Sequence, residues 1–287
     1  APRPSPDGRW LPYQERVVTR MRLRAREIAT NQSTIVSSTL PGPYFREFPP
    51  DWQFQSVAWS PSGSDLYFVD QPAESEYILR RFRLNAAQAE SFPITRTRGS
   101  MSMTDIFPIA EGRAVSFLTR SANSCTLHRL DVNAGADDVK PPFPCSLFTQ
   151  LRGWTRGDGA AVIVRPVKLN DDTTNSVEVM LIPANGPAPR VYSVDRVYIS
   201  STRLDSERAL LYLTRTEEGV HNMYALSLDT GKLISVTKNR TPDVTFTGVE
   251  PIGSGLVVGA RHERKSDIWL LEPGPASANA PARAVPR

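Results

Sequence analysis

A short turn motif that recurs at near-constant spacing is the feature that most limits how this chain can fold. It reads Ser5-Pro6-Asp7-Gly8, then Ser60-Pro61-Ser62-Gly63, and each copy precedes a run of strand-forming residues. Proline presets the first corner of a tight turn, and Asp and Gly accept the left-handed corner that reverses the chain. Weaker copies end at positions 112, 159, 207 and 255, so successive steps are 55, 49, 47, 48 and 48 residues. The chain is therefore expected to contain six similar units.

Each period carries a pattern of four strands. The motif joins the first strand to the second, and third strands are expected at residues 80–84, 126–132, 177–182, 224–228 and 268–271. Weaker fourth strands follow at 92–95, 190–194 and 233–237. This pattern predicts an all-β fold, a six-bladed β-propeller of four-stranded antiparallel blades. Stacking the blades around an axis buries faces that one blade leaves open. A β-sandwich is the alternative, but it would lack the four-strand period.

The repeat also predicts the domain organisation. We expect one propeller domain over residues 1–272, with blades beginning near residues 1, 52, 101, 148, 195 and 243. The first blade has no obvious strand before the first turn motif, and the last has no clear fourth strand. Residues 273–287 are rich in Pro and Ala and are expected to be disordered or to close the ring.

One stretch, residues 14–30, has two interpretations. It is rich in arginine and resembles an amphipathic helix. However, Met21, Leu23 and Ala25 alternate with arginines, which is the periodicity of a strand. We therefore predict that it contains the third strand of the first blade.

Composition narrows the class of protein. Hydrophobic residues make up 40% and charged residues 22%, as in soluble globular proteins. No apolar run approaches the roughly 18 residues of a membrane helix, so no membrane insertion is expected from this segment. The start lacks the apolar core of a signal peptide, so an exported protein would be represented here by a mature form or an excised domain. The 34 basic residues are dispersed rather than clustered, and nucleic-acid binding is not expected. Most of them are arginine, a bias typical of GC-rich bacterial genomes.

The two cysteines, Cys125 and Cys145, lie 20 residues apart without the spacing of a zinc site. An even count fits one disulfide in an oxidising compartment. Cys125 opens the expected third strand of blade three and Cys145 lies near its fourth strand, where antiparallel neighbours come within bridging distance. Two unrelated buried thiols are the alternative.

Motifs for catalysis are missing from the sequence. It contains no Gly-x-Ser-x-Gly elbow, no His-Glu-x-x-His pair and no phosphate-binding glycine loop. Of three histidines, His221 and His262 lie near hairpin tips of neighbouring blades, and two histidines are few for a metal site. The pair Asp171-Asp172 lacks the central glycine of a calcium loop. We therefore expect no catalytic residues, no metal and no cofactor.

Recognition is expected at one end of the propeller. Loops between second and third strands (residues 71–76, 120–124, 170–175, 215–219 and 262–266) emerge there with the loop at 41–51, and function often lies in loops on a rigid scaffold. Aromatic side chains in the 41–51 loop are possible partner anchors, although packing on the ring is the alternative. The candidate partner- or ligand-binding residues are Tyr44, Phe45, Glu74, Glu76, Asp171, Asp172, Glu217, Glu218, His262 and Arg264.

The segment Val57-Ala58-Trp59-Ser60-Pro61-Ser62-Gly63, followed by Leu66-Tyr67-Phe68-Val69, resembles the repeat of the TolB-like propeller family. Asp267-Ile268-Trp269-Leu270-Leu271 resembles the third-strand element of that repeat. Ser62 stands where the repeat usually has aspartate, and repeats three to five lack the proline.

The resemblance implies a periplasmic or extracellular module that binds a protein partner or small ligand without catalysis. One such role is the sensor domain of a membrane-anchored transcriptional regulator. The alternative is the propeller of a hydrolase, gating a peptidase, or a propeller lyase. The resemblance leaves the oligomeric state open.

Overall fold

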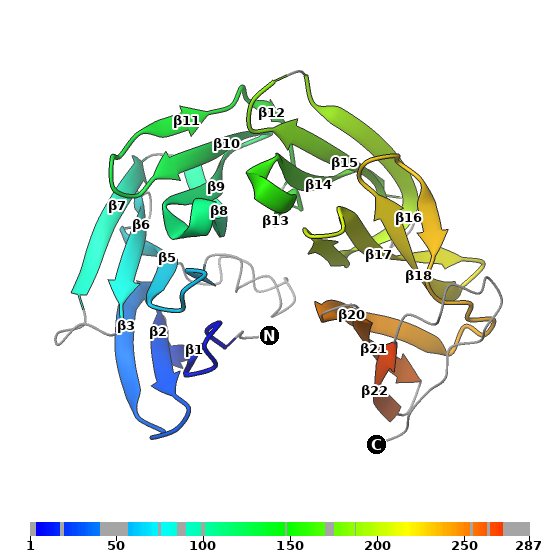
Figure 1. Ribbon diagram of the computed structural model, residues 1–287, viewed down its shortest axis with the longest axis horizontal. Coiled ribbons are helices and arrows are strands. Elements are labelled where there is room, and N and C mark those ends of the chain that lie inside the picture. The colour runs from blue at the N-terminus through cyan, green and yellow to red at the C-terminus, as the bar shows by residue number, and fades with distance from the viewer. Residues whose placement is uncertain are drawn as a thin grey trace. The chain divides into compact units, whose positions relative to one another are not determined.

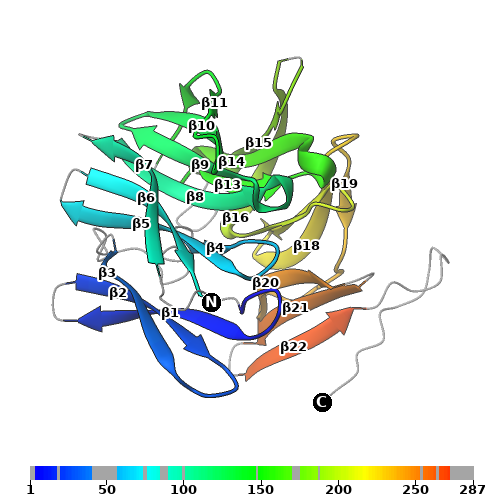
Figure 2. The ribbon, with the colours of Figure 1, turned by 60° about the vertical axis from the view of Figure 1, so that its left-hand side comes forward.

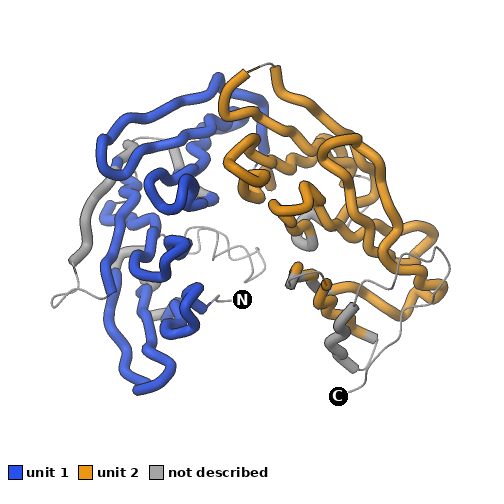
Figure 3. The backbone as a smooth tube through the Cα atoms, viewed as in Figure 1, with its two compact units in different colours: residues 1–146 blue, residues 147–287 orange. Residues whose placement is uncertain are grey.

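The computed structural model describes residues 4–17, 20–40, 57–73, 76–84, 90–98, 101–146, 148–169, 175–186, 188–252, 255–262 and 265–271. Within these residues the regular structure is β-strand, apart from two short 3-10 turns. The predicted all-β class is therefore confirmed. The chain divides into two compact units, Ala1–Ser146 and Leu147–Arg287 (Figure 3). No helix in the described ranges is long and apolar enough to cross a membrane.

The first unit contains three antiparallel sheets that follow one another along the chain (Figure 1 and Figure 2). The first has the order β1-β2-β3, the second β4-β5-β6-β7, and the third β11-β10-β9-β8 with β12 also paired to β10. The strands are β1 (Trp10–Val17), β2 (Arg20–Glu27), β3 (Ser33–Leu40), β4 (Val57–Trp59), β5 (Asp65–Ala73), β6 (Glu76–Arg83), β7 (Glu90–Arg98), β8 (Met101–Ile109), β9 (Ala114–Ser121), β10 (Ser124–Asp131), β11 (Asp137–Val139) and β12 (Phe143–Pro144). The expected strand in the arginine-rich stretch is confirmed as β2.

The second unit contains a seven-stranded sheet, β13 to β19 in chain order, and a three-stranded sheet, β20-β21-β22. Its strands are β13 (Gln150–Trp154), β14 (Ala160–Leu169), β15 (Asn175–Pro183), β16 (Arg190–Asp205), β17 (Leu210–Glu217), β18 (Val220–Ser227), β19 (Leu233–Ser235), β20 (Val244–Ile252), β21 (Gly255–His262) and β22 (Lys265–Leu271). The seven strands form one sheet because β16 is long enough to pair with a different strand along each half of its length. Its first half pairs with β15, and its second half pairs with β17.

Sheets within a unit stack face to face, which explains why a strand such as β5 is apolar on both sides. Leu66 and Phe68 face a core shared with the first sheet, where they meet Leu23 of β2. Tyr67 and Val69 point the other way, into a core shared with the third sheet. All four β5 side chains are essentially buried. A strand buried on both faces reads as a continuous hydrophobic run rather than as an alternation.

The second unit is built in the same way. Alternate residues of β14 and β15, such as Val162 and Val179, join Leu211 and Leu213 of β17 in one core. On the opposite face of β17, Tyr212 packs with Val249 and Val258 of the three-stranded sheet. Both faces of β17 are therefore covered within this unit.

The recurring turns do more than reverse the chain, because successive turns also touch. A β-carbon added to Gly63 would lie 3.2 Å from Cγ of Asp7 in the preceding turn. One added to Gly112, in η2 (Ala110–Gly112), would lie 3.4 Å from Cδ of Pro61. These two glycines thus have two roles. They adopt the left-handed φ that the reversal needs, and they leave room for the preceding turn.

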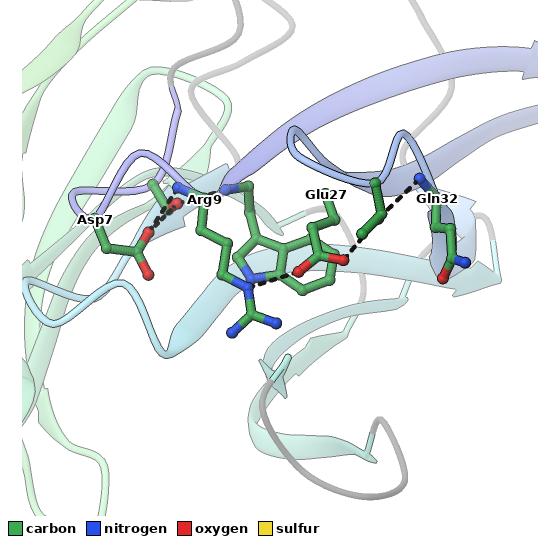
Figure 4. A network of polar contacts seen from close by, with 7 residues as sticks. Asp7, Arg9, Glu27 and Gln32 are labelled. Carbon is green, nitrogen blue, oxygen red and sulfur yellow. Dashed lines mark hydrogen bonds and ion pairs between the residues drawn. The ribbon is translucent and has the colours of Figure 1, made fainter.

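Figure 4 shows the polar network around the first turn. The Ser5 hydroxyl donates to Asp7 Oδ1, and the backbone N–H of Arg9 donates to the same oxygen at 3.1 Å. These hydrogen bonds, led by that from Ser5, lower the pKa of Asp7. Arg9 Nε then donates to Glu27 Oε1 at 2.7 Å, which ties the turn to the end of β2.

The strand count differs from the sequence expectation in a specific way. The described sheets have three, four, five, seven and three strands rather than equal sets of four. The boundary expected near residue 195 falls inside β16, because residues 190–205 contain neither Gly nor Pro to end a strand. The strand changes partners at Val197, which pairs with Asn175 of β15 and with Arg215 of β17.

Candidate recognition surface

Among the hairpins that the sequence assigns to the loop end, the structure describes two without gaps, β9–β10 and β17–β18. Six of the ten candidate residues lie outside the described residues: Tyr44, Phe45, Glu74, Asp171, Asp172 and Arg264. Glu76 is half-buried at the start of β6, opposite Ala73. His262 ends β21 and pairs with Lys265 along the backbone. Only Glu217 and Glu218 come together in the described part of the chain, both exposed at the β17–β18 tip.

The β17–β18 tip is held by an arginine at its base. Arg215 Nη1 lies 3.2 Å from Glu217 Oε1, and its Nε donates to the carbonyl of Asp195 at 3.0 Å. The same guanidinium lies over the Tyr224 ring, 5.1 Å from its centroid. Arg215 therefore fixes the hairpin to β16, although the exposed ion pair itself contributes little stability. Glu218 has φ 51°, the left-handed corner of the turn.

His221 connects three elements at this end of the sheet. Its Nδ1 is hydrogen-bonded to the Thr216 hydroxyl at 3.0 Å, across the β17–β18 pair. Its ring is tilted against Tyr198 of β16, with centroids 5.3 Å apart. Burial lowers the pKa of His221, so the neutral imidazole is favoured at neutral pH.

Two asparagines fix the segment that follows β19. Asn222 Oδ1 accepts hydrogen bonds from the Thr237 hydroxyl at 3.1 Å and from the Asn239 backbone N–H at 2.6 Å. Asn239 Nδ2 in turn donates to the carbonyls of His221 and Thr241, at 3.4 Å and 2.7 Å. With Asn239 turned inward, its neighbours Lys238 and Arg240 are exposed. The segment is therefore a fixed loop that displays charged side chains.

Sequence reasoning missed Asn222 and Asn239, because it considered only hairpin tips. The available signal was the run Lys238-Asn239-Arg240-Thr241-Pro242-Asp243 after a three-residue strand. Such a cluster of Asn, Asp, Thr and Pro marks a turn-rich loop that hydrogen-bonds to itself. We define the surface formed by Tyr198, Glu217, Glu218, His221 and residues 236–241 as the β17–β18 surface.

The β9–β10 hairpin carries the disulfide. Cys125 and Cys145 are bonded, with their Cα atoms 5.6 Å apart, so the predicted pairing is confirmed. The backbone N–H of Cys145 donates to the Asn123 carbonyl at 2.9 Å, beside the hairpin tip. Pro141 and Pro142 interrupt the outer strand between β11 and β12 because they lack N–H donors. The disulfide therefore anchors an outer segment in which only the short strands β11 and β12 are paired through the backbone.

Three side chains of the same sheet have the order of a hydrolase triad. His128 Nδ1 lies 2.8 Å from Asp137 Oδ2, and its Nε2 lies 2.9 Å from the Thr119 hydroxyl. The imidazole is also stacked on Phe117, with centroids 4.7 Å apart. However, Thr119 is 1% exposed, so a substrate cannot reach its hydroxyl. The three groups link β9, β10 and β11 as a structural tie.

No protein-family model and no curated protein sequence matches the chain. Among solved structures, TolB from Acinetobacter baumannii is similar over 91% of this chain and 65% of its own, with a TM-score of 0.53 and 12% identity. An oligogalacturonate lyase in complex with manganese is similar over 94% of this chain and 72% of its own, with a TM-score of 0.64 and 12% identity. Prolyl oligopeptidase B from Galerina marginata is similar over 99% of this chain and 42% of its own, with a TM-score of 0.65 and 8% identity.

These similarities show a β-propeller fold for the chain. At such identities they show the fold alone, because unrelated functions share this architecture. The chain spans less than two thirds of the TolB structure and less than half of the peptidase. The neighbours include a lyase and a peptidase as well as TolB, so the fold does not decide whether this chain is an enzyme.

Proposed function

We propose that residues 1–272 form a single propeller of six four-stranded blades beginning near residues 1, 52, 101, 148, 195 and 243. The near-constant period of the turn motif supports this division. The long strand β16 fits it as the outer strand of one blade and the inner strand of the next. Residues 273–287 are proposed to be a tail or the segment that closes the ring.

We infer that the propeller is a non-enzymatic module that recognises a protein partner or ligand through its loop end. The observation that carries this proposal is the fixed geometry of the β17–β18 surface. His221 is held by Thr216, and residues 236–241 are held by Asn222. Surfaces ordered before binding lose less conformational entropy when the partner arrives. The other candidate residues, Tyr44, Phe45, Glu74, Glu76, Asp171, Asp172, His262 and Arg264, are proposed to extend this surface around the loop end.

The proposed location is the periplasm or the outside of the cell. The Cys125–Cys145 bond supports an oxidising compartment, where disulfides form and persist. Within that location, the more specific proposal is a sensor domain belonging to a membrane-anchored transcriptional regulator.

The enzymatic alternative is a lyase or the propeller of a peptidase, classes represented among the neighbours. Within the described residues, no three His, Cys, Asp or Glu side chains gather as a metal site. The Asp137–His128–Thr119 arrangement has a buried hydroxyl. Either enzyme would therefore need groups beyond those described, which keeps binding as the first proposal.

Chemical crosslinking of the immobilised propeller in a periplasmic extract tests the binding proposal. The variants are Glu217→Lys at the β17–β18 tip and, as a matched charge reversal, Glu207→Lys. Glu207 is 73% exposed and lies before β17, at the opposite end of that strand. A partner recognised at the loop end is captured by wild type and by the Glu207 variant but lost by the Glu217 variant. Equal capture by all three proteins would refute recognition at this surface.

A further inference from the structure

The connection between β15 and β16 contains the sequence Ala184-Asn185-Gly186. Ala184 is buried, whereas Asn185 and Gly186 are exposed. Of the ten asparagines in the chain, Asn185 is the only one followed by glycine. Gly186 has φ +117°, and a β-carbon added to it would meet nothing within 4 Å. The Asn185 side chain and the next backbone nitrogen therefore share an open, sterically free site.

We propose that Asn185 is a site of spontaneous modification, at which the side-chain amide is converted to a carboxylate. The backbone nitrogen of Gly186 attacks Cγ of Asn185, a C–N bond forms, and the side-chain nitrogen leaves as ammonia. The proton from the Gly186 N–H passes to the departing nitrogen through water. One water molecule then opens the five-membered imide at either carbonyl and leaves aspartate or isoaspartate. No oxidant or reductant is needed.

Hydrogen bonding distinguishes Asn185 from the other described asparagines. Among the described residues, neither the Asn185 side-chain amide nor the Gly186 N–H makes a hydrogen bond. After Asn133, by contrast, the N–H of Ala134 donates to Asp131 Oδ1 at 2.7 Å. After Asn31, the N–H of Gln32 donates to the Thr30 hydroxyl at 3.3 Å. A nitrogen engaged in this way must break its bond before it can attack.

The remaining described asparagines are restrained differently. The side chains of Asn222 and Asn239 are held in the hydrogen bonds that fix residues 236–241. Asn175 begins β15, and Asn123 directly precedes β10, so the nitrogen that follows each lies in a paired strand. Extended, paired backbone keeps the following nitrogen away from Cγ. The structure therefore singles out Asn185 by conformation as well as by sequence.

The modification leaves the unit folded because both ends of the connection are anchored. The Ala184 N–H donates to the Gly159 carbonyl at 3.0 Å, and Arg190 pairs with Leu181. The new carboxylate lowers the formal net charge from +4 by one unit. This end of β15 is opposite to the β14–β15 hairpin, and hence opposite to the β17–β18 surface. The product is thus a charge variant of the folded protein with its proposed recognition surface intact.

Incubation of the purified folded chain near neutral pH, followed by peptide mass mapping, tests the proposal. The peptide with Asn185 is expected to convert about fivefold or more faster than those with Asn31 and Asn133, because their nucleophilic nitrogens must first lose a hydrogen bond. A protein isoaspartyl methyltransferase with a labelled methyl donor should label the same peptide. In urea, conversion at Asn133 should rise and the difference should narrow.

Asn185→Gln is the matched control, since it keeps an amide but lengthens the side chain so that the five-membered ring cannot form. It should abolish the acidic species and the methyl label. Gly186→Ala, a second control, should slow conversion without removing Asn185. The proposal is overturned if the native chain converts Asn185 no faster than Asn133, or if the acidic species persists in the Asn185→Gln variant.

Discussion

Replacing Gly231 by alanine tests how closely the turn after β18 fits against β16. Gly231 has φ +73°, a conformation that costs an alanine about 1 kcal/mol. The added β-carbon would also lie 2.6 Å from Cε1 and 2.8 Å from Cδ1 of Tyr192. The Tyr192 ring must therefore move, although its hydroxyl donates to the Leu228 carbonyl at 3.0 Å.

Moving the ring is expected to cost about 2 kcal/mol more, from the weakened hydrogen bond and from overpacking. The total for Gly231→Ala is then about 3 kcal/mol of the free energy of unfolding. Gly8→Ala is the matched control, because Gly8 has φ +70° but would meet nothing within 4 Å. That variant is expected to lose only the backbone contribution, about 1 kcal/mol.

Equilibrium denaturation in urea measures both variants, and a Tyr192→Ala background completes a double-mutant cycle. Without the ring, Gly231→Ala should cost no more than Gly8→Ala does in wild type. The reasoning fails if Gly231→Ala and Gly8→Ala destabilise the wild-type chain equally. It also fails if removing the Tyr192 ring leaves the cost of Gly231→Ala unchanged.

Three further perturbations address other parts of the structure. Asp70→Ala removes the buried carboxylate to which Arg80 Nε donates at 2.7 Å. The free energy of unfolding, measured in urea, should fall by about 3 kcal/mol, and a fall no larger than that expected for an exposed ion pair would contradict this. Replacing Cys125 and Cys145 together by serine should lower the free energy of unfolding by about 3 kcal/mol for a loop of this length. An unchanged midpoint of urea denaturation would argue against anchoring by the disulfide. His221 has a folded pKa below its ordinary 6.5, so its contribution is complete above that pH and falls as pH drops through the lowered pKa. Thermal melts should show this loss in wild type but not in His221→Gln.

The repeating turns could be predicted from the sequence because a hairpin is local. Pro, Asp and Gly specify the reversal within four residues, and the following strand is apolar enough to identify itself. The second role of Gly63, which gives room to Asp7 from the preceding turn, could not be seen in this way. That contact joins residues more than fifty positions apart, and no local pattern records it.

The loop end was harder to predict for a related reason. Charged hairpin tips such as Glu217 and Glu218 stand out in a sequence, and the structure places both at an exposed turn. The residues that order this end, Asn222 and Asn239, lie within or after strands and act through long-range hydrogen bonds. The role of an asparagine in a strand is not evident until its hydrogen-bond partners are known. Sequence patterns therefore identified what is displayed but not what holds it in place.

The long strand β16 has a consequence for how this chain could have grown or lost repeats. Its two halves pair with different neighbours, yet no break in the backbone separates them. Excision of one period of about 48 residues at this point would remove half of a strand from a sheet that remains. The two repeats that share β16 are therefore expected to be inherited together and to exchange amide hydrogens as one cooperative block. Duplication or loss by single repeats would be tolerated more readily where successive sheets are joined by a loop.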